Sequence, residues 1–200
     1  MQRIVAGRLG GRRLLPLPRA ITGVRPSSGR VRGAIFDRLQ AEVVGARVLD
    51  LFAGTGALAI EALSRGAAAA TLVEQHPRLV KFLGEQVGAL GLEAQIEIVR
   101  GDARRFLTRV SEAPASARYD LVLVDPPYAE IELYAEVLDA LVARAHLADD
   151  AIVVMEYEKR RGQRPAIPLP ASLIHEVTRD HGQTALEFLR HRDLRLPSRE

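Results

Sequence analysis

The stretch "RVLDLFAGTGALAIEALSRG", residues 47–66, decides the fold. An apolar run that ends at Asp50 is typical of a buried strand, and the segment after the glycines has helical apolar spacing. Gly54 and Gly56 permit a tight turn and a close approach of the backbone to a ligand. Gly66 is a typical helix end. The stretch therefore predicts a strand, a glycine turn and a helix.

The same alternation continues along the chain. Further strands are predicted at residues 69–74, 95–101, 119–127, 150–158, 172–180 and 184–192, and helices at 76–91, 103–110 and 131–146. Strands that are apolar on both faces and alternate with helices indicate a mostly parallel sheet with helices on both sides. We therefore expect an α/β, Rossmann-like fold with a mostly parallel seven-stranded sheet and an antiparallel C-terminal strand.

The N-terminal residues predict an extension to this domain. Residues 1–20 read as a β-hairpin, and Ser28 is a suitable N-cap for a following helix. We expect two units, an arginine-rich extension over residues 1–40 and the α/β domain over residues 41–200.

Charge is distributed unevenly between these parts. Residues 1–38 hold nine arginines and one acidic residue, a net charge of +8, whereas residues 39–158 have a net charge of −9. A basic arm on an acidic body indicates a polyanionic partner that meets one face. The alternative is an ordinary solvated face.

Composition excludes several other classes of protein. The chain has 200 residues and no cysteine, and its five histidines are scattered. No apolar run approaches the ~18 residues of a membrane span, and the first residues lack the apolar segment of a secretory signal. We expect a monomeric cytoplasmic protein with no metal and no membrane association.

Acidic residues stand at the ends of four successive predicted strands: Asp50, Glu74, Asp102 and Asp125. Ligands of such sheets bind at the carboxyl ends of the strands. Any one of these acids alone could be a helix cap or a loop residue. Four in succession, together with the glycine turn, indicate a binding site.

The positions of three acids indicate an adenosine ligand. Asp50, just before the glycine turn, would repel a pyrophosphate and suits a ligand with an ammonium group. Glu74 stands where a carboxylate accepts hydrogen bonds from both ribose hydroxyls. Asp102, backed by Ala103, is placed to meet an adenine amino group. NAD and S-adenosylmethionine both remain possible ligands at this point.

The segment "DPPY", Asp125 to Tyr128, resembles the signature of methyltransferases that modify exocyclic amino nitrogens of bases. The lone pair of such an amine is delocalised into the ring, and two acceptors, the Asp125 carboxylate and the Pro126 carbonyl, would hold its protons and redirect it. Pro126 and Pro127 fix φ and remove competing donors, so the acceptors stay in place. Tyr128 offers a ring for the extruded base to stack on. The alternative is a simple turn.

Several segments in order resemble one family along nearly the full chain: "RPSSGRVRGAIFDRL", "ARVLDLFAGTGALAIEALSRGA", "VRGDA", "DLVLVDPPY" and "HGQTALEFLR". They are similar to the bacterial 16S rRNA guanine-N2 methyltransferases of the RsmD type, which are class I S-adenosylmethionine-dependent methyltransferases. The resemblance implies methylation of a guanine N2 in 16S rRNA, on the 30S subunit or an assembly intermediate.

The resemblance also implies roles for particular residues. It implies an S-adenosylmethionine site at Asp50, Phe52, Ala53, Gly54, Gly56, Glu74, Asp102 and Ala103. It implies a catalytic guanine site at Asp125, Pro126, Pro127 and Tyr128. It implies RNA contacts at Arg25, Arg30, Arg32 and Arg38.

Departures from the family pattern are few, and other functions remain in competition. Ser27 and Ser28 stand where the family has a threonine pair, and Tyr157 stands where a histidine is common. One alternative keeps the fold but changes the target to adenine N6 of DNA or RNA, or to a protein glutamine. Others are a non-catalytic RNA-binding assembly protein and an NAD oxidoreductase, which leaves the DPPY segment unexplained.

Overall fold

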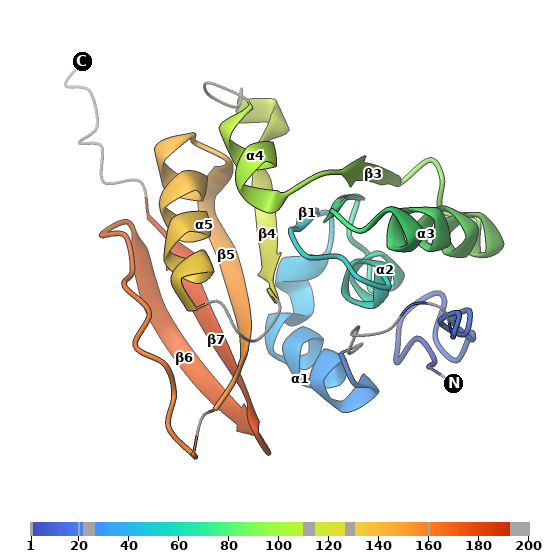
Figure 1. Ribbon diagram of the computed structural model, residues 1–200, viewed down its shortest axis with the longest axis horizontal. Coiled ribbons are helices and arrows are strands. Elements are labelled where there is room, and N and C mark those ends of the chain that lie inside the picture. The colour runs from blue at the N-terminus through green and yellow to red at the C-terminus, as the bar shows by residue number, and fades with distance from the viewer. Residues whose placement is uncertain are drawn as a thin grey trace.

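The computed structural model describes residues 2–19, 21, 27–109, 115–126, 131–159 and 161–192. These residues form a seven-stranded sheet with the order β3-β2-β1-β4-β5-β7-β6 (Figure 1). The strands are β1 (Arg47–Asp50), β2 (Ala69–Glu74), β3 (Ile96–Arg100), β4 (Tyr119–Val124), β5 (Leu147–Glu158), β6 (Leu173–His181) and β7 (Thr184–His191). β1 to β5 pair in parallel, and β7 runs antiparallel between β5 and β6. The predicted fold class is confirmed.

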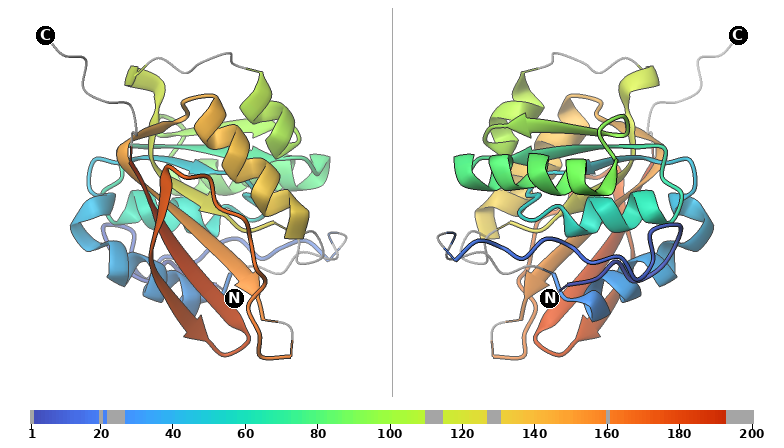
Figure 2. Two further views of the ribbon diagram at one scale, coloured as in Figure 1. Left: turned by 90° about the vertical axis from the view of Figure 1, so that its left-hand side faces the viewer. Right: turned by 90° about the vertical axis from the view of Figure 1, so that its right-hand side faces the viewer.

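Helices cover both faces of the sheet. They are α1 (Gly29–Leu39), α2 (Ala57–Ser64), α3 (Pro77–Leu90), α4 (Ala103–Thr108) and α5 (Ile131–Ala143), with 3-10 turns η1 (Gln40–Val43) and η2 (Ala115–Ala117). One apolar core joins α1, α2 and α3 to one sheet face, and a second joins α4 and α5 to the other (Figure 2). No helix in the described part of the chain is long and apolar enough to cross a membrane.

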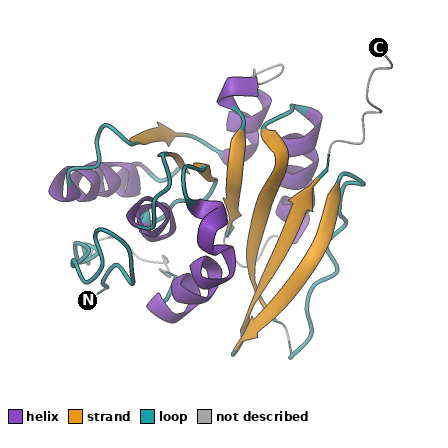
Figure 3. Cartoon of the chain, turned by 180° about the vertical axis from the view of Figure 1, so that it is seen from behind, coloured by secondary structure: helices purple, strands orange, loops and turns teal. Residues whose placement is uncertain are grey.

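The C-terminal strands extend the sheet beyond its parallel part. Seen from behind, β5, β7 and β6 are the longest strands and twist away from β4 (Figure 3). β5 has 12 residues, whereas β4 has six. β7 pairs with the last seven residues of β5, from Ile152 to Glu158. The last parallel strand, β5, therefore has an antiparallel neighbour along its C-terminal half.

Ser28 caps α1 as predicted. Its side chain accepts a hydrogen bond from the backbone N–H of Val31 at 3.2 Å, which satisfies one of the free donors of the first turn. The apolar stripe of the helix, including Ile35, Phe36 and Leu39, is buried in the first core. The cap and the stripe together fix where Ser27, the residue before the cap, lies.

The expected N-terminal hairpin is present in a short form. An antiparallel bridge joins Arg3 to Arg13, and backbone hydrogen bonds of 3.0 Å run from the Ile4 N–H to the Arg12 carbonyl and from the Leu14 N–H to the Gln2 carbonyl. The backbone N–H groups of Val5 and Ala6 donate to the buried carboxylate of Glu61 on α2, at 2.8 and 3.0 Å, instead of to a partner strand. The segment is therefore fastened to a helix. Apolar side chains of residues 1–40 belong to the first core, together with α2 and α3. A separate RNA-contacting unit over residues 1–40 stays a prediction.

Candidate cofactor and substrate site

Five acidic residues line the carboxyl edge of the parallel strands. In sheet order they are Asp102, Glu74, Asp50, Asp125 and Glu156, and each belongs to a different strand or to the residues that follow it. The first four were predicted from strand ends, and the fold brings them to one edge. No local pattern distinguishes Glu156 in the sequence, because β5 continues beyond it to Glu158.

The glycine turn joins β1 to α2 and contacts the end of β2. Gly54 and Gly56 have positive φ values of 52° and 74°. A Cβ atom on Gly56 would lie 2.7 Å from Leu83 Cδ2, so the turn also packs closely on α3. The Ala53 N–H donates to the carbonyl of Val73 at 3.0 Å, which holds the turn against β2. The turn needs glycine for both its backbone conformation and its packing.

Glu74 accepts hydrogen bonds from the turn. The backbone N–H of Gly54 donates to Oε2 at 2.9 Å, and the N–H of His76 donates to Oε1 at 2.7 Å. Glu74 is 9% exposed, and a carboxylate can accept about four hydrogen bonds. Its orientation is therefore fixed by the backbone while acceptor capacity is left for a pair of ligand hydroxyls.

Asp50 is buried with one oxygen unsatisfied. The residue is 1% exposed, and Oδ2 has no hydrogen-bond partner among the described residues. Burial raises the pKa of Asp50 to about 7; a hydrogen bond from the Phe52 backbone opposes this rise, and the charge of Glu74 adds to it. An ionised carboxylate in this position lowers the stability of the free protein, and a cation or hydrogen-bond donor from a ligand would offset that loss.

Asp102 is the N-cap of α4. Its Oδ1 accepts the backbone N–H of Arg105 at 3.1 Å, and its Oδ2 pairs with Arg104 at 3.2 Å. Burial acts to raise the pKa of Asp102, but the hydrogen bonds from Arg104 and Arg105 outweigh it and the pKa is lowered. The simple cap that was the alternative for this residue is thus present, and its contact with adenine stays a proposal.

Asp125 and Glu156 lie side by side. The register pairs Val124 with Met155, so the next residue of each strand is the neighbour of the other. The Ser27 hydroxyl, just before α1, lies 3.3 Å from Asp125 Oδ2 and 3.3 Å from Glu156 Oε2. Burial raises the pKa of Asp125 well above its ordinary value, and the charges of Glu156 and Asp50 add to the rise, while the Ser27 hydrogen bond opposes it.

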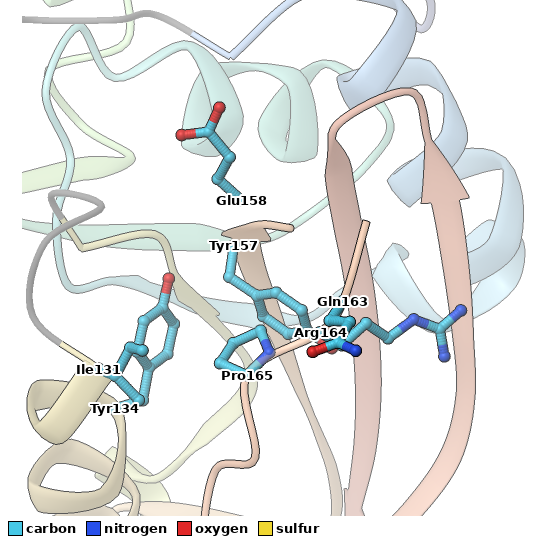
Figure 4. A pocket seen from close by; sticks show the side chains of 7 residues that line it. All are labelled: Ile131, Tyr134, Tyr157, Glu158, Gln163, Arg164 and Pro165. Carbon is cyan, nitrogen blue, oxygen red and sulfur yellow. The ribbon is translucent and has the colours of Figure 1, made fainter. Parts of the chain in front are cut away.

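Two tyrosines hold the end of β5. The Tyr134 hydroxyl donates to the Glu156 carbonyl at 2.6 Å, and the Tyr157 hydroxyl donates to Glu187 on β7 at 2.9 Å. The rings meet edge to face with centroids 6.2 Å apart. They line a cavity of about 210 Å³ between α5 and the residues after β5 (Figure 4). The backbone that carries Glu156 is therefore fixed from both sides.

The remaining predicted site residues fall into two groups. Ala53 and Ala103 are buried at 6% and 4% exposure beside the turn and α4, Phe52 is half-buried, and Pro126 is buried after β4. Pro127, Tyr128 and Arg25 lie outside the described residues. Their predicted roles stay predictions.

The predicted RNA-binding arginines differ in their surroundings. Arg30 is exposed and has no ion pair with any residue that the structure describes. Arg38 pairs with Glu176 at 2.9 Å and Glu42 at 3.6 Å. Arg32 is 1% exposed; it donates to the carbonyls of Ser27 and Arg3 at 2.5 and 2.7 Å. Its burial argues against the expected RNA contact, because its guanidinium faces the interior.

Arg32 instead connects the N-terminal segment to the body. Its Nε lies 3.8 Å from Glu61 Oε2, the carboxylate that also accepts the N–H groups of Val5 and Ala6. Burial lowers the pKa of Arg32, and the charge of Glu61 opposes this. A charged residue in a basic segment is expected at the surface, whereas the spacing of Arg32 with Ile35 and Phe36 places it on the buried side of α1.

Comparison with known proteins gives consistent matches. The family model described as "Conserved hypothetical protein 95" matches residues 2–190. The chain is 37% identical over 174 residues to "Ribosomal RNA small subunit methyltransferase D" of Escherichia coli strain K12, covering 87% of this chain and 83% of that protein. It is 32% identical over 157 residues to "Putative rRNA methyltransferase YlbH" of Bacillus subtilis strain 168, covering 78% and 83%.

Solved structures agree with these matches. "Putative methyltransferase yhhF" from Escherichia coli superposes with a TM-score of 0.81 at 34% identity, covering 96% of this chain and 98% of that one. A "putative methylase HI0767" from Haemophilus influenzae superposes with a TM-score of 0.77 at 25% identity, covering 96% and 98%.

Proposed function

We propose that this chain, which belongs to the RsmD family described as conserved hypothetical protein 95, transfers a methyl group from S-adenosylmethionine to the exocyclic N2 of a guanine in 16S rRNA. The observation that carries the proposal is the position of Asp125, which follows β4 and neighbours Asp50 at the edge of the sheet. We place the reaction in the cytoplasm, on the 30S subunit or an assembly intermediate, and expect the enzyme to act as a monomer.

The residues of the edge fit S-adenosylmethionine. Asp50 offers a buried oxygen with no partner among the described residues, which suits the ammonium group of the methionine part. Glu74 retains acceptor capacity for the ribose hydroxyls, and the Gly54 turn brings the backbone close. Asp102 and Ala103 would flank the adenine. When bound, S-adenosylmethionine supplies a methyl group activated by a sulfonium sulfur.

Asp125 holds the amine that becomes methylated. Its carboxylate accepts one N2–H, and the Pro126 carbonyl accepts the other, which turns the nitrogen lone pair out of conjugation with the ring. The raised pKa of Asp125 makes it a stronger proton acceptor than an exposed carboxylate. After the new bond forms, one N2 proton leaves to Asp125 or to water. The chain's contribution is positioning and proton acceptance.

The N-terminal segment offers a basic surface for RNA. Arg3 and Arg12 are exposed and donate to carbonyls of the chain, at 2.8 Å for Arg3 and 3.2 Å for Arg12 Nη2. A carbonyl orients a guanidinium without cancelling its charge. With exposed Arg13 and Arg30, these residues leave uncompensated positive charge on the segment that precedes the site.

The structure disfavours the non-catalytic alternative on energetic grounds. Asp50 and Asp125 both have raised pKa values because of burial, and each therefore destabilises the folded protein when ionised. A protein that only binds RNA does not need two ionised carboxylates that lower its folding stability. The NAD alternative leaves the acid next to the glycine turn facing a pyrophosphate.

Nucleoside mass spectrometry tests the proposal. Purified protein, S-adenosylmethionine and 30S particles from a strain that lacks the gene should yield N2-methylguanosine at one site of 16S rRNA. Asp125→Ala should reduce the rate about 100-fold or more and leave the affinity for S-adenosylmethionine within a few-fold, since the residue acts on the incoming base. Formation of N6-methyladenosine instead, or full turnover by the variant, would refute the assignment.

A further inference from the structure

We infer that Glu156 accepts the N1–H of the target guanine and so selects guanine over adenine; this rests on the proposed methylation of guanine N2. The two acidic residues would then divide the Watson–Crick edge of the base. Asp125 would hold the N2 amine, and Glu156 the neighbouring ring N–H.

The geometry of the pair supports this division. Asp125 and Glu156 each come directly after the last residues paired between β4 and β5, Val124 and Met155. Each has a carboxylate oxygen 3.3 Å from the same Ser27 hydroxyl, so the two oxygens face one small volume. Both distances exceed those of a good O–H···O hydrogen bond, and a hydroxyl has a single proton for two acceptors. Ser27 is therefore a weak occupant that a better donor would displace.

Guanine carries donors in the matching arrangement. Its N2 amine and N1–H are adjacent and point in nearly the same direction. Adenine presents an amine next to an N1 lone pair, which would face the Glu156 carboxylate without a proton between them. Leaving a buried acceptor unpaired against a lone pair opposes binding of the wrong base.

Asp50 gives an independent indication that a ligand enters this volume. Its Oδ2 is buried without a partner in the described part of the chain, and its charge raises the pKa of Asp125. Asp125 lies within electrostatic reach of both Asp50 and Glu156, and a donor or cation from a ligand in this volume would offset the repulsion between their charges. The methionine ammonium would meet Asp50, and the base would meet the other two.

Glu156 is also held rigidly enough to discriminate. Its residue is 4% exposed, its carbonyl accepts the Tyr134 hydroxyl, and its backbone is paired with Leu186 on β7. A specificity group needs this support, because a side chain that could turn away from a wrong base would not reject it.

The test uses 2-aminopurine, which keeps the N2 amine of guanine but has a lone pair at N1. Full-length protein is assayed on 30S particles reconstituted with ligated 16S rRNA that carries guanine or 2-aminopurine at the methylated position. The parent enzyme should prefer guanine by about 10- to 150-fold in kcat/KM beyond the intrinsic difference of the two amines, the worth of a hydrogen bond to a charged group. In Glu156→Gln this preference should shrink by the same factor, since an amide can also donate to N1.

A matched control is Glu97→Gln on β3, the same chemical change at an exposed position. It should leave the preference unchanged, and S-adenosylmethionine affinity reports that each variant is folded. If no N2-methylguanosine forms with any enzyme, both this inference and the proposed function are refuted. If it forms but parent and Glu156→Gln show the same preference, or the parent accepts both bases equally, only the role of Glu156 is refuted.

Discussion

Replacing Asp50 by asparagine should stabilise the free protein at neutral pH while removing its affinity for S-adenosylmethionine. Asp50 is 1% exposed, and burial raises its pKa from 3.8 to about 7. The folded state therefore holds a proton that the unfolded chain has lost. Stability from this group is fully present below the unfolded pKa and is lost as the pH rises to the folded pKa.

The size of the effect follows from the two pKa values. For each pH unit between 3.8 and about 7, the free energy of unfolding falls by about 1.4 kcal/mol. The total loss is about 4 kcal/mol once Asp50 is ionised. Asparagine has nearly the same shape and does not ionise. Relative to the parent, the variant should gain about 3 kcal/mol between about pH 5 and about pH 8, equivalent to roughly 6 to 12 °C in Tm.

Thermal and urea unfolding of both proteins across this pH range checks the prediction. Exposed Asp139 on α5 provides the control, and Asp139→Asn should leave the pH dependence as in the parent. Calorimetry should show that the parent binds S-adenosylmethionine more weakly below about pH 7, because protonation of Asp50 removes the charge that meets the ammonium group. A stability difference between Asp50→Asn and the parent that does not change with pH would refute the reasoning.

Three further predictions concern the cofactor site and the N-terminal segment. Glu74→Gln keeps one acceptor for the turn but loses the charge that faces the ribose, so S-adenosylmethionine affinity should fall about 10- to 150-fold by calorimetry; an unchanged Kd would place the ribose elsewhere. Arg13→Glu with Arg30→Glu should weaken binding to 30S particles and reduce the salt slope of log affinity by about 1.4, at about 0.7 per phosphate. Arg32→Met should instead destabilise the fold by about 1 to 3 kcal/mol, because the carbonyls of Ser27 and Arg3 lose their donor, whereas Glu61 keeps its ion pair with Arg65. Equal salt slopes for parent and double variant, or a Tm of Arg32→Met equal to that of the parent, would contradict these roles.

The sequence predicted the edge of the sheet well because β1 to β4 end at their acidic residues or within two residues of them. Hydrophobic runs mark these ends, and a parallel sheet aligns them whatever the long-range details. Glu156 was not predicted as a site residue because β5 continues past it. No break in the hydrophobic pattern of the strand distinguishes Glu156 from Glu158. Its neighbour Ser27 is 129 residues away in the sequence, a contact that local patterns do not encode.

Two N-terminal differences from the sequence prediction have a common physical cause. The predicted hairpin is short, because the acceptor for Val5 and Ala6 is a buried carboxylate on α2. The family resemblance predicts an RNA contact for Arg32, whereas Arg32 is buried beside the same carboxylate. Charged side chains are usually exposed, whereas Arg32 and Glu61 are both buried. Residue type alone therefore predicts the wrong burial for both.

The attachment of the N-terminal segment to Glu61 also sets a time at which this segment can fold. Val5 finds its acceptor on a residue 56 positions later in the chain. At a synthesis rate of about 5 to 20 residues per second, the segment waits roughly 3 to 11 seconds for that residue to be added. The segment therefore cannot reach its final place before α2 has been added to the chain, and its arginines stay exposed while the helix that receives it is still being translated.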